Sequence, residues 1–328
     1  MSALPSGESI TPCDAPQTFF IANDPDNFPR GPSWGIIRLM RVIWTLILLF
    51  LASPLTAHPG VGIVMDRKGN VYYTDLSQVW RITPSGQRSV VVPGVHTHEL
   101  TLDTAGNLFG EHTWYEGDAT KKWGHYVWRL SPDGNVSRVI PATEGFLQNY
   151  SFVRDGRGTM YLAEGDPRTV IRKRMADGRI LSHAKGPFRN IRWMHATADG
   201  TLFLIDSGDL RRVAPDGTVK TVSPGLAAKS VAQFSVQDHH IVMGVWTDTR
   251  GNAYAAVYGG RVVKKITPGG AVSIAARSAP PWSPTGGLIA PDGSLWLLEY
   301  SIQNTARVRR IAPDGRVAHL VTAKAKSE

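Results

Sequence analysis

One hairpin pattern occurs six times in this sequence, and it limits the possible folds more than any other feature. Each copy has two short strands of alternating apolar and polar residues, joined by a turn that contains glycine. The six turn glycines are Gly69, Gly106, Gly158, Gly200, Gly251 and Gly293. A second hairpin turn follows each copy, with its glycine at Gly86, Gly134, Gly178, Gly217, Gly270 and Gly315. Each repeat therefore predicts four short antiparallel strands.

The repeats recur every 37 to 52 residues, which is the length of a β-propeller blade. Helical periodicity is absent after residue 58. We therefore predict an all-β fold, a six-bladed β-propeller of four-stranded antiparallel blades. Whole blades are expected to close the ring, with no strand exchanged between its two ends.

The first hairpin of the repeats, with segments such as "MDRKGNVYYTD", has the form D-x-x-G-N-x-Y. Over residues 59–322 it resembles the hairpins of NHL-repeat propellers and of the gluconolactonase-like and strictosidine-synthase-like six-bladed group. That group includes lactonases, lyases and binding modules, and its gluconolactonases hold a divalent metal with a Glu and Asn or Asp side chains. The chain has "HPGVG" in its first blade, where those relatives have Glu-Gly-Pro. The resemblance thus predicts the architecture more strongly than the activity.

A leader is predicted before the repeats. Residues 42–52 form an apolar run behind Arg41, and small Ala57 follows as a cleavage point, so residues 40–57 have the anatomy of a signal peptide. Met40 is then the expected start and residues 1–39 a doubtful extension. We predict a propeller over residues 58–322, a flexible tail at 323–328, and a secreted or periplasmic protein without a stable membrane span. The alternative is a membrane anchor formed by residues 42–52.

The predicted mature chain contains no cysteine, because Cys13 lies in the doubtful extension. Disulfides therefore cannot stabilise it, although an exported protein could form them.

The densest group of ionisable residues lies in the second repeat. In a propeller, the segments before the innermost strands and the loops between second and third strands share one face around the channel. His96 and His98 project to the same side of an extended chain and, with Glu99, are candidate ligands of one divalent metal ion of unknown identity. Glu111 and His112 end the adjacent second strand, so they lie at the same rim and are candidate acid–base residues. An exposed polar loop with hydrogen-bonded histidines explains the pattern equally well.

Other blades contribute further candidates to this face. The fifth blade, opposite the second, begins with Asp238, His239 and His240, and His240 is a candidate for proton transfer. Asn149 and Arg192 precede the third and fourth innermost strands as candidate ligand-binding residues, and His195 lies within the fourth. For all of these, ordinary loop or hydrogen-bonded roles are favoured.

Aromatic residues and carboxylates also gather at this rim. Trp114 belongs to the longest predicted rim loop, "EHTWYEGDATKKWGHY" of the second blade, and Trp282 to the sixth blade. Both could stack on a sugar or aryl ligand, although packing on their own blades is slightly favoured. Carboxylates end the second strands at Asp75, Glu164, Asp206 and Glu299, and this recurrence favours a structural cap on the following loop.

The chain is basic, with 36 Lys and Arg against 27 Asp and Glu. One basic residue stands five positions before every second turn glycine, at Arg81, Arg129, Lys173, Arg212, Lys265 and Arg310. Such regularity indicates a blade feature, so nucleic acid is not an expected partner. No glycine-rich phosphate loop occurs, and no nucleotide cofactor is expected.

Two functions remain open from the sequence. One is a metal-dependent hydrolase, lactonase or lyase that acts on a small molecule or glycan at the channel mouth. The other is a non-catalytic extracytoplasmic scaffold for a glycan or protein. A monomer is expected in both cases.

Overall fold

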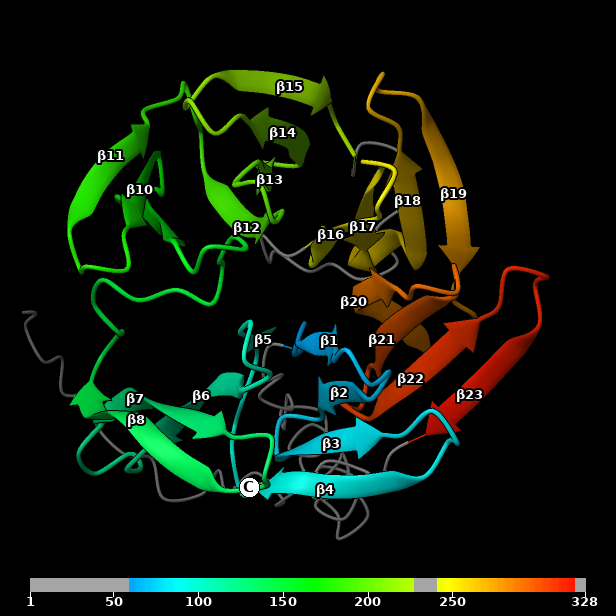
Figure 1. Cartoon of the computed structure of the whole chain (residues 1–328), viewed down its shortest axis with the longest axis horizontal. Coiled ribbons are helices and arrows are strands. Elements are labelled where there is room, and N and C mark those ends of the chain that lie inside the picture. Colours follow the sequence, from blue (N-terminus) through cyan, green and yellow to red (C-terminus); the bar gives the residue numbers. More distant parts are fainter. Residues whose placement is uncertain (1–58, 227–240, 322–328) are drawn as a thin grey trace, which may run out of the picture. The chain divides into compact units, whose positions relative to one another are not determined.

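The computed structural model describes residues 59–226 and 241–321, which belong to one structural unit, Thr56–Glu328. Their strands form six antiparallel sheets arranged as the blades of a β-propeller (Figure 1). The predicted all-β, six-bladed fold is therefore confirmed. The one helical element in these two ranges is the short 3-10 helix η1 (Tyr258–Gly260).

The first three blades contain eleven strands. The first blade comprises β1 (Ile63–Met65), β2 (Val71–Thr74), β3 (Gln78–Ile82) and β4 (Arg88–Pro93). The second comprises β5 (Leu100–Leu102), β6 (Leu108–Tyr115), β7 (Trp123–Leu130) and β8 (Val136–Glu144). The third comprises β9 (Met160–Glu164), β10 (Val170–Arg174) and β11 (Ile180–Ala184).

The last three blades have four strands each. The fourth comprises β12 (Ile191–Ala196), β13 (Leu202–Asp206), β14 (Asp209–Val213) and β15 (Val219–Ser223). The fifth comprises β16 (Val245–Thr247), β17 (Ala253–Val257), β18 (Val262–Ile266) and β19 (Val272–Arg277). The sixth comprises β20 (Trp282–Ile289), β21 (Leu295–Ser301), β22 (Ala306–Ile311) and β23 (Val317–Val321).

Every blade is built from consecutive strands, so the described residues show no strand exchange between the first and last blades. These two blades are joined by packing instead. Tyr73 and Tyr300 belong to one buried apolar cluster, and the Tyr300 hydroxyl donates a hydrogen bond to the carbonyl of Thr74 (3.0 Å). Burial of large aromatic side chains thus closes the ring.

The third blade departs from the prediction of four strands. Its innermost strand is reduced to an isolated bridge between Arg154 and Met160. The preceding segment bends at Asn149, whose φ of 54° is unusual for a residue with a side chain. This irregular backbone lies at the channel mouth, where it shapes the site described below.

The hairpin turns explain why glycine recurs. All twelve turn glycines have positive φ, which side chains disfavour and glycine adopts freely. An aspartate ahead of the glycine completes several of these turns: Asp66 Oδ1 accepts the backbone N–H groups of Lys68 and Asn70 at 2.9 and 2.8 Å. Local sequence therefore fixes the turns.

The regular basic residues have a structural place. Each lies opposite an aromatic residue of the second strand, as in the pairs Tyr72–Arg81 and Trp296–Arg310. The Arg310 guanidinium lies 5.6 Å from the centre of the Trp296 ring. The periodic charge thus belongs to the packing of the blades.

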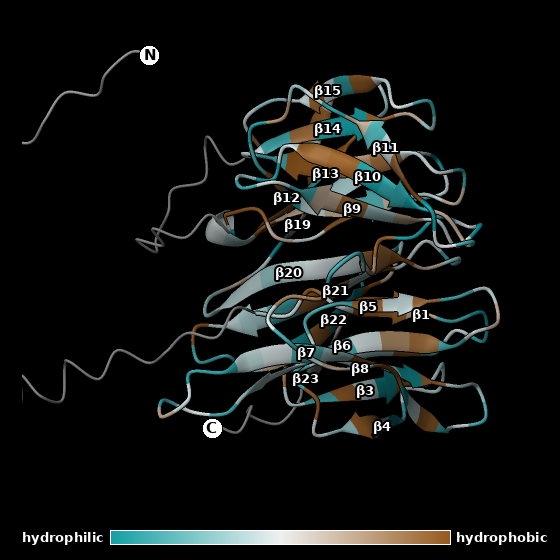
Figure 2. Cartoon of the chain, turned by 90° about the vertical axis from the view of Figure 1, so that its left-hand side faces the viewer, coloured by the Kyte–Doolittle hydropathy of each residue, from teal (hydrophilic) through white to brown (hydrophobic). Residues whose placement is uncertain are grey.

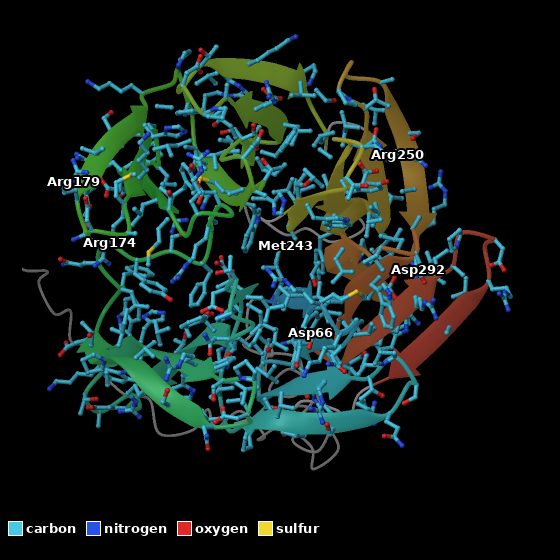
Figure 3. The ribbon with its side chains drawn as sticks, in the orientation of Figure 1. Asp66, Arg174, Arg179, Met243, Arg250 and Asp292 are labelled. Atoms are coloured by element: carbon cyan, nitrogen blue, oxygen red, sulfur yellow. The ribbon has the colours of Figure 1, made fainter. Side chains whose placement is uncertain are left out.

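Apolar residues concentrate between the blades. Figure 2 shows hydrophobic colouring on strands such as β13, all of whose residues are buried, and hydrophilic colouring on many connecting loops. In Figure 3, Arg179 lies at the outer edge of the third blade and buried Met243 near the middle of the ring. The core therefore follows the interblade surfaces.

The described residues contain no helix that is long and apolar enough to cross a membrane. The predicted extension at 1–39, the leader at 40–57 and the tail at 323–328 lie outside the described residues.

Candidate functional site

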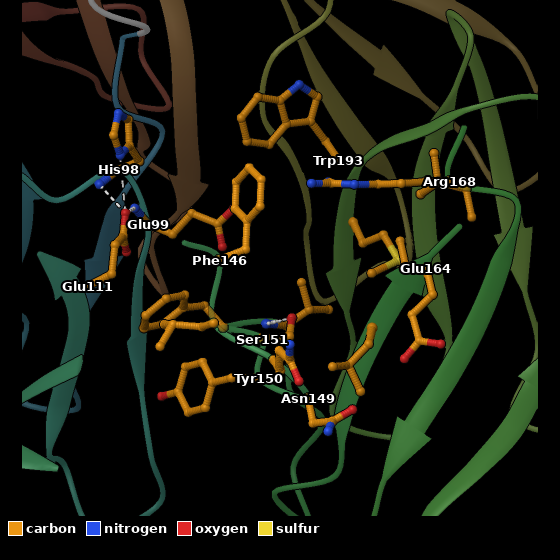
Figure 4. A pocket seen from close by; sticks show the side chains of 18 of the residues that line it. His98, Glu99, Glu111, Phe146, Asn149, Tyr150, Ser151, Glu164, Arg168 and Trp193 are labelled. Carbon is orange, nitrogen blue, oxygen red and sulfur yellow. Dashed lines mark hydrogen bonds and ion pairs between the residues drawn. The ribbon is translucent and has the colours of Figure 1, made fainter. Parts of the chain in front are cut away.

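A cavity of about 530 Å³ opens at the mouth of the channel between the second, third and fourth blades (Figure 4). The second blade contributes His98, Glu99 and Glu111 to its wall. The third contributes residues 146–153 and the loop after β9, and the fourth contributes the start of β12. The face predicted from the order of the strands therefore carries a cavity of small-molecule size.

Glu111, on β6, anchors the segment before β5. Its Oε1 accepts the backbone N–H groups of His98 (2.6 Å) and Glu99 (3.3 Å), and the Nδ1 atom of His98 lies 3.3 Å away. The side chain is 6% exposed, and its Oε2 has no hydrogen-bond partner in residues 59–226 and 241–321. A buried carboxylate oxygen without a donor costs about 1–3 kcal/mol, so this atom points to a missing partner.

Glu99 lies next to this carboxylate on the cavity wall and is partly buried. Burial, together with the negative charge of Glu111, raises the pKa of Glu99 to about 7, although His98 and Arg168 act in the opposite direction. Glu99 can therefore hold or release a proton near neutral pH, as an acid–base catalyst must.

The histidines of the second blade are brought together as predicted. The rings of His96 and His98 lie 4.8 Å apart, and burial lowers the pKa of His96 to about 4. His112 takes part in packing: its Nδ1 accepts the backbone N–H of His96 (2.9 Å), and its ring stacks on Tyr126. The two histidines therefore have different roles: His98 lines the cavity, and His112 supports the backbone before β5.

The side chains of the predicted metal site do not surround a common point. Within the described ranges, no group of three or more His, Cys, Asp or Glu side chains converges in a way that could hold an ion. Glu111 Oε1 is already used by the backbone of residues 98 and 99. His96, His98 and Glu99 thus do not fit a three-ligand metal site. The opposed candidates Asp238, His239 and His240 lie outside the described residues.

Two arginines line the cavity together with these acids. Arg192, which was predicted to precede the fourth innermost strand, lies within β12, whereas Arg168 comes from the loop after β9. In Figure 4 the Arg168 side chain extends into the cavity from the wall opposite Glu111. The cavity therefore has carboxylates on one side and a guanidinium on the other.

Aromatic side chains complete the walls. Phe146, Tyr150 and Trp193 line the cavity, and Phe146 is 71% exposed although it packs edge-on against Trp123 (4.6 Å between ring centres). His125 also lines the cavity, and its Nδ1 lies 2.7 Å from the carbonyl of Gly145. Apolar ring faces next to a few charged groups are typical of ligand sites.

The other predicted ligand-binding residues lie in different surroundings. Asn149 lines the cavity, and its carbonyl accepts a hydrogen bond from Arg174 (3.1 Å). Trp114 packs on Gly124, where an added Cβ would approach the indole to 2.4 Å, and Trp282 lies under the guanidinium of Arg307 (4.3 Å). Neither tryptophan lines the mouth cavity.

The predicted long rim loop that contains Trp114 is mostly strand, because β6 extends to Tyr115 and β7 begins at Trp123. The prediction of a long loop was wrong. Backbone pairing between β6 and β7 extends as far as Tyr115 and Trp123. Gly124, which lies opposite Trp114, leaves room for the indole ring.

His195 lies in a second cavity of about 620 Å³, which is lined by the innermost strands and shares Glu99 and Trp193 with the mouth cavity. Its Nε2 lies 3.1 Å from Thr247 Oγ1 of the next blade, and burial lowers its pKa to about 4. The hydrogen-bonded role that the sequence favoured is therefore observed.

The recurring carboxylates act inside the blades. Asp75 Oδ1 accepts the backbone N–H groups of Ser77 and Gln78, each at 3.0 Å, and Asp206 Oδ1 accepts two backbone N–H groups before β12. Glu299 is fully buried and pairs with Arg307 (2.6 Å). Of these three carboxylates, Asp75 forms the predicted cap on the following loop, whereas Asp206 holds the loop before β12 and Glu299 pairs with an arginine.

Sequence reasoning missed Arg168, Phe146, Tyr150 and Trp193. Loops between the second and third strands lie at the channel mouth in every blade, so the third blade also contributes one. This loop, after β9, has the sequence "GDPRT" and contains one cationic residue. That cation was the available signal for Arg168. No sequence pattern distinguished the three aromatic residues.

No family model and no curated protein matches this chain. Solved structures do resemble it. A streptogramin B lyase is 16% identical with a TM-score of 0.50, and the match covers 83% of this chain and 86% of the lyase. A calcium-binding regucalcin from Agrobacterium tumefaciens is 15% identical, with a TM-score of 0.50 and coverage of 83% and 94%.

A protein described as a candidate gluconolactonase is 14% identical, with a TM-score of 0.51 and coverage of 81% of this chain and 92% of that one. These likenesses agree with the propeller group that the hairpins predicted. At such low identity they establish the fold.

Proposed function

We propose that this propeller binds a small, hydroxyl-bearing molecule in the mouth cavity and catalyses an acid–base step on it through Glu99. The observation that carries the proposal is the buried Oε2 of Glu111, which has no donor in the described ranges and belongs to a side chain of the cavity wall. Because this oxygen has almost no accessible surface, the Glu111 carboxyl group must shift slightly for a ligand hydroxyl to supply the donor, and the new hydrogen bond would then offset the cost of the unpaired oxygen.

Hydrolysis of an ester or lactone suits these groups. The Glu99 carboxylate takes a proton from water while the water oxygen bonds to the carbonyl carbon. The bond to the leaving oxygen then breaks, and the proton on Glu99 passes to that oxygen. A pKa of about 7 allows Glu99 both to accept and to donate the proton at neutral pH.

Glu111 has a positioning role in this scheme. Because its Oε1 accepts the backbone N–H groups of both His98 and Glu99, it fixes the segment that presents Glu99 to the cavity. Its charge also helps to keep the pKa of Glu99 high.

The test is turnover of a panel of sugar lactones and aryl esters by the purified propeller, followed by pH-stat titration. We expect kcat/KM to rise with pH through about 7, as Glu99 loses its proton. Glu99→Gln should lower kcat/KM by about 10²-fold or more. Glu164→Gln is the matched control, since Glu164 lines the same cavity and is paired with Arg172 (2.6 Å). Unchanged turnover by Glu99→Gln would contradict the catalytic role.

A second candidate is non-catalytic glycan binding at the rim. It is favoured by the exposure of Phe146 (71%) and Tyr115 (58%), because exposed aromatic faces stack on sugar rings. Under this alternative, Phe146→Ser and Tyr115→Ser weaken binding on a glycan array, and Glu99→Gln leaves it unchanged.

We further propose that the protein acts outside the cytoplasm. The support is the signal-peptide pattern of residues 40–57. N-terminal sequencing of exported protein should find a chain that begins close to His58. A mature chain that retains residues 42–52 would instead support the membrane anchor.

A further inference from the structure

Two guanidinium groups at the mouth cavity have no hydrogen-bond or ion-pair partner among the residues that the structure describes. Arg168 and Arg192 both line the cavity, and neither side chain makes a hydrogen bond or ion pair with another residue of 59–226 or 241–321. Two arginines of the neighbouring strands differ in that respect: Arg172 of β10 pairs with Glu164 at 2.6 Å and Arg211 of β14 with Asp206 at 3.2 Å. The cavity therefore offers positive charge that the described protein does not neutralise by contact.

The backbone places these two arginines together. The carbonyl of Arg168 accepts the N–H of Ile191 (2.9 Å), which ties the loop after β9 to the start of β12. Arg192 follows at once, in a register shift of β12 between Ile191 and Trp193. Such bulges turn a side chain away from its regular direction and are frequent beside active sites. One interblade hydrogen bond thus fixes both arginines on the rim.

The opposite wall has complementary chemistry. Figure 4 shows Glu111, Glu99 and His98 across the cavity from Arg168 and Trp193. The unpartnered Oε2 of Glu111 accepts a hydrogen bond and repels an anion, whereas guanidinium groups attract one. A ligand that satisfies both walls must carry an anionic group at one end and a hydroxyl at the other.

We propose that the ligand of this cavity is a hydroxyl-bearing organic anion, such as a sugar acid, whose anionic group binds Arg168 and Arg192 while a hydroxyl donates to Glu111 Oε2. This inference rests on the proposed function, because it assumes that a small molecule occupies the cavity. Phe146, Tyr150 and Trp193 also line the cavity, and aromatic rings suit the apolar face of a sugar ring.

The experiment compares charged and neutral derivatives of one hexose by isothermal titration calorimetry with the full chain at low salt. The probes are glucuronate, its neutral methyl ester, glucose and glucose 6-phosphate. We expect glucuronate to bind about tenfold more tightly than its methyl ester, since hydrogen bonds to charged groups are the stronger ones. The phosphate probe distinguishes selectivity for carboxylates from general recognition of anions.

The double variant Arg168→Gln and Arg192→Gln should remove this preference, bringing the ratio of the two affinities close to one. Arg316→Gln is the control, because Arg316 is exposed, pairs with Asp314 (2.6 Å) and does not line the cavity. Thermal unfolding of each variant shows that the fold is retained. A preference for glucuronate that survives in the double variant overturns the proposal.

The outcomes separate this inference from the proposed function. Equal binding of glucuronate, its ester and glucose refutes the anionic ligand and leaves the small-molecule site intact. If no probe binds and no lactone or ester is turned over, the proposed function fails and this inference fails with it.

Discussion

Replacing Glu99 by glutamine tests whether the folded protein raises the pKa of this carboxyl group and so makes its stability depend on pH. Burial and the charge of Glu111 raise the pKa of Glu99 from 4.5 to about 7. Between these pH values the folded protein holds a proton that the unfolded chain has released. The free energy of unfolding therefore falls as pH rises through this window, and above pH 7 the folded protein bears the full cost of an ionised Glu99.

The size of this change in the free energy of unfolding follows from the pKa values of Glu99 in the unfolded and folded protein. One pKa unit corresponds to about 1.4 kcal/mol, so the difference between 4.5 and about 7 corresponds to roughly 3 kcal/mol as an upper limit. Glutamine has nearly the same shape and no charge. The Glu99→Gln variant should match the wild type near pH 4.5 and become progressively more stable than it up to pH 7.5.

Urea denaturation at several pH values between 4.5 and 8.5 measures this difference directly. His96 and His195, whose pKa values burial lowers to about 4, titrate in both proteins, so their contributions cancel in the comparison. Glu116→Gln is the control: it removes an exposed carboxylate from the same blade and should change stability by less than about 0.5 kcal/mol. A stability difference that is constant with pH would refute the reasoning.

Three further predictions concern the scaffold. Gly110→Ala should destabilise the protein by about 1–3 kcal/mol in urea denaturation, because its Cβ would lie 2.3 Å from the Trp128 ring; Gly269→Ala, with one neighbouring atom at 3.9 Å, should not. Asp75→Ala should cost roughly 3 kcal/mol in the same assay, because it removes the acceptor of two backbone N–H groups and an indole N–H. His195→Asn should weaken the loss of stability on acidification from pH 6.5 to 4 by about 1 kcal/mol per pH unit, since the buried imidazole resists protonation; equal slopes in the two proteins would contradict this.

Much of the candidate site could be located from the sequence, because strand order decides which loops share a face. His98, Glu99 and Glu111 were placed at the channel mouth on that basis, and all three line the cavity. Their individual roles could not be assigned. The use of Glu111 Oε1 by the backbone, and of His112 Nδ1 by the N–H of His96, depends on side-chain directions in an irregular segment.

The sequence by itself determined the architecture. Glycines at turns that require positive φ, and alternating strands between them, repeat six times and leave few alternatives to a propeller. These signals are local, since each depends on residues only a few positions apart.

Only the tertiary structure decided what faces the acids across the cavity. Arg168 and Trp193 come from other blades, and the packing of whole sheets sets their position. The innermost strand of the third blade, which is reduced to one bridge between Arg154 and Met160, was likewise not evident from the repeat. Convergence between blades depends on contacts distant in sequence, which no short pattern encodes.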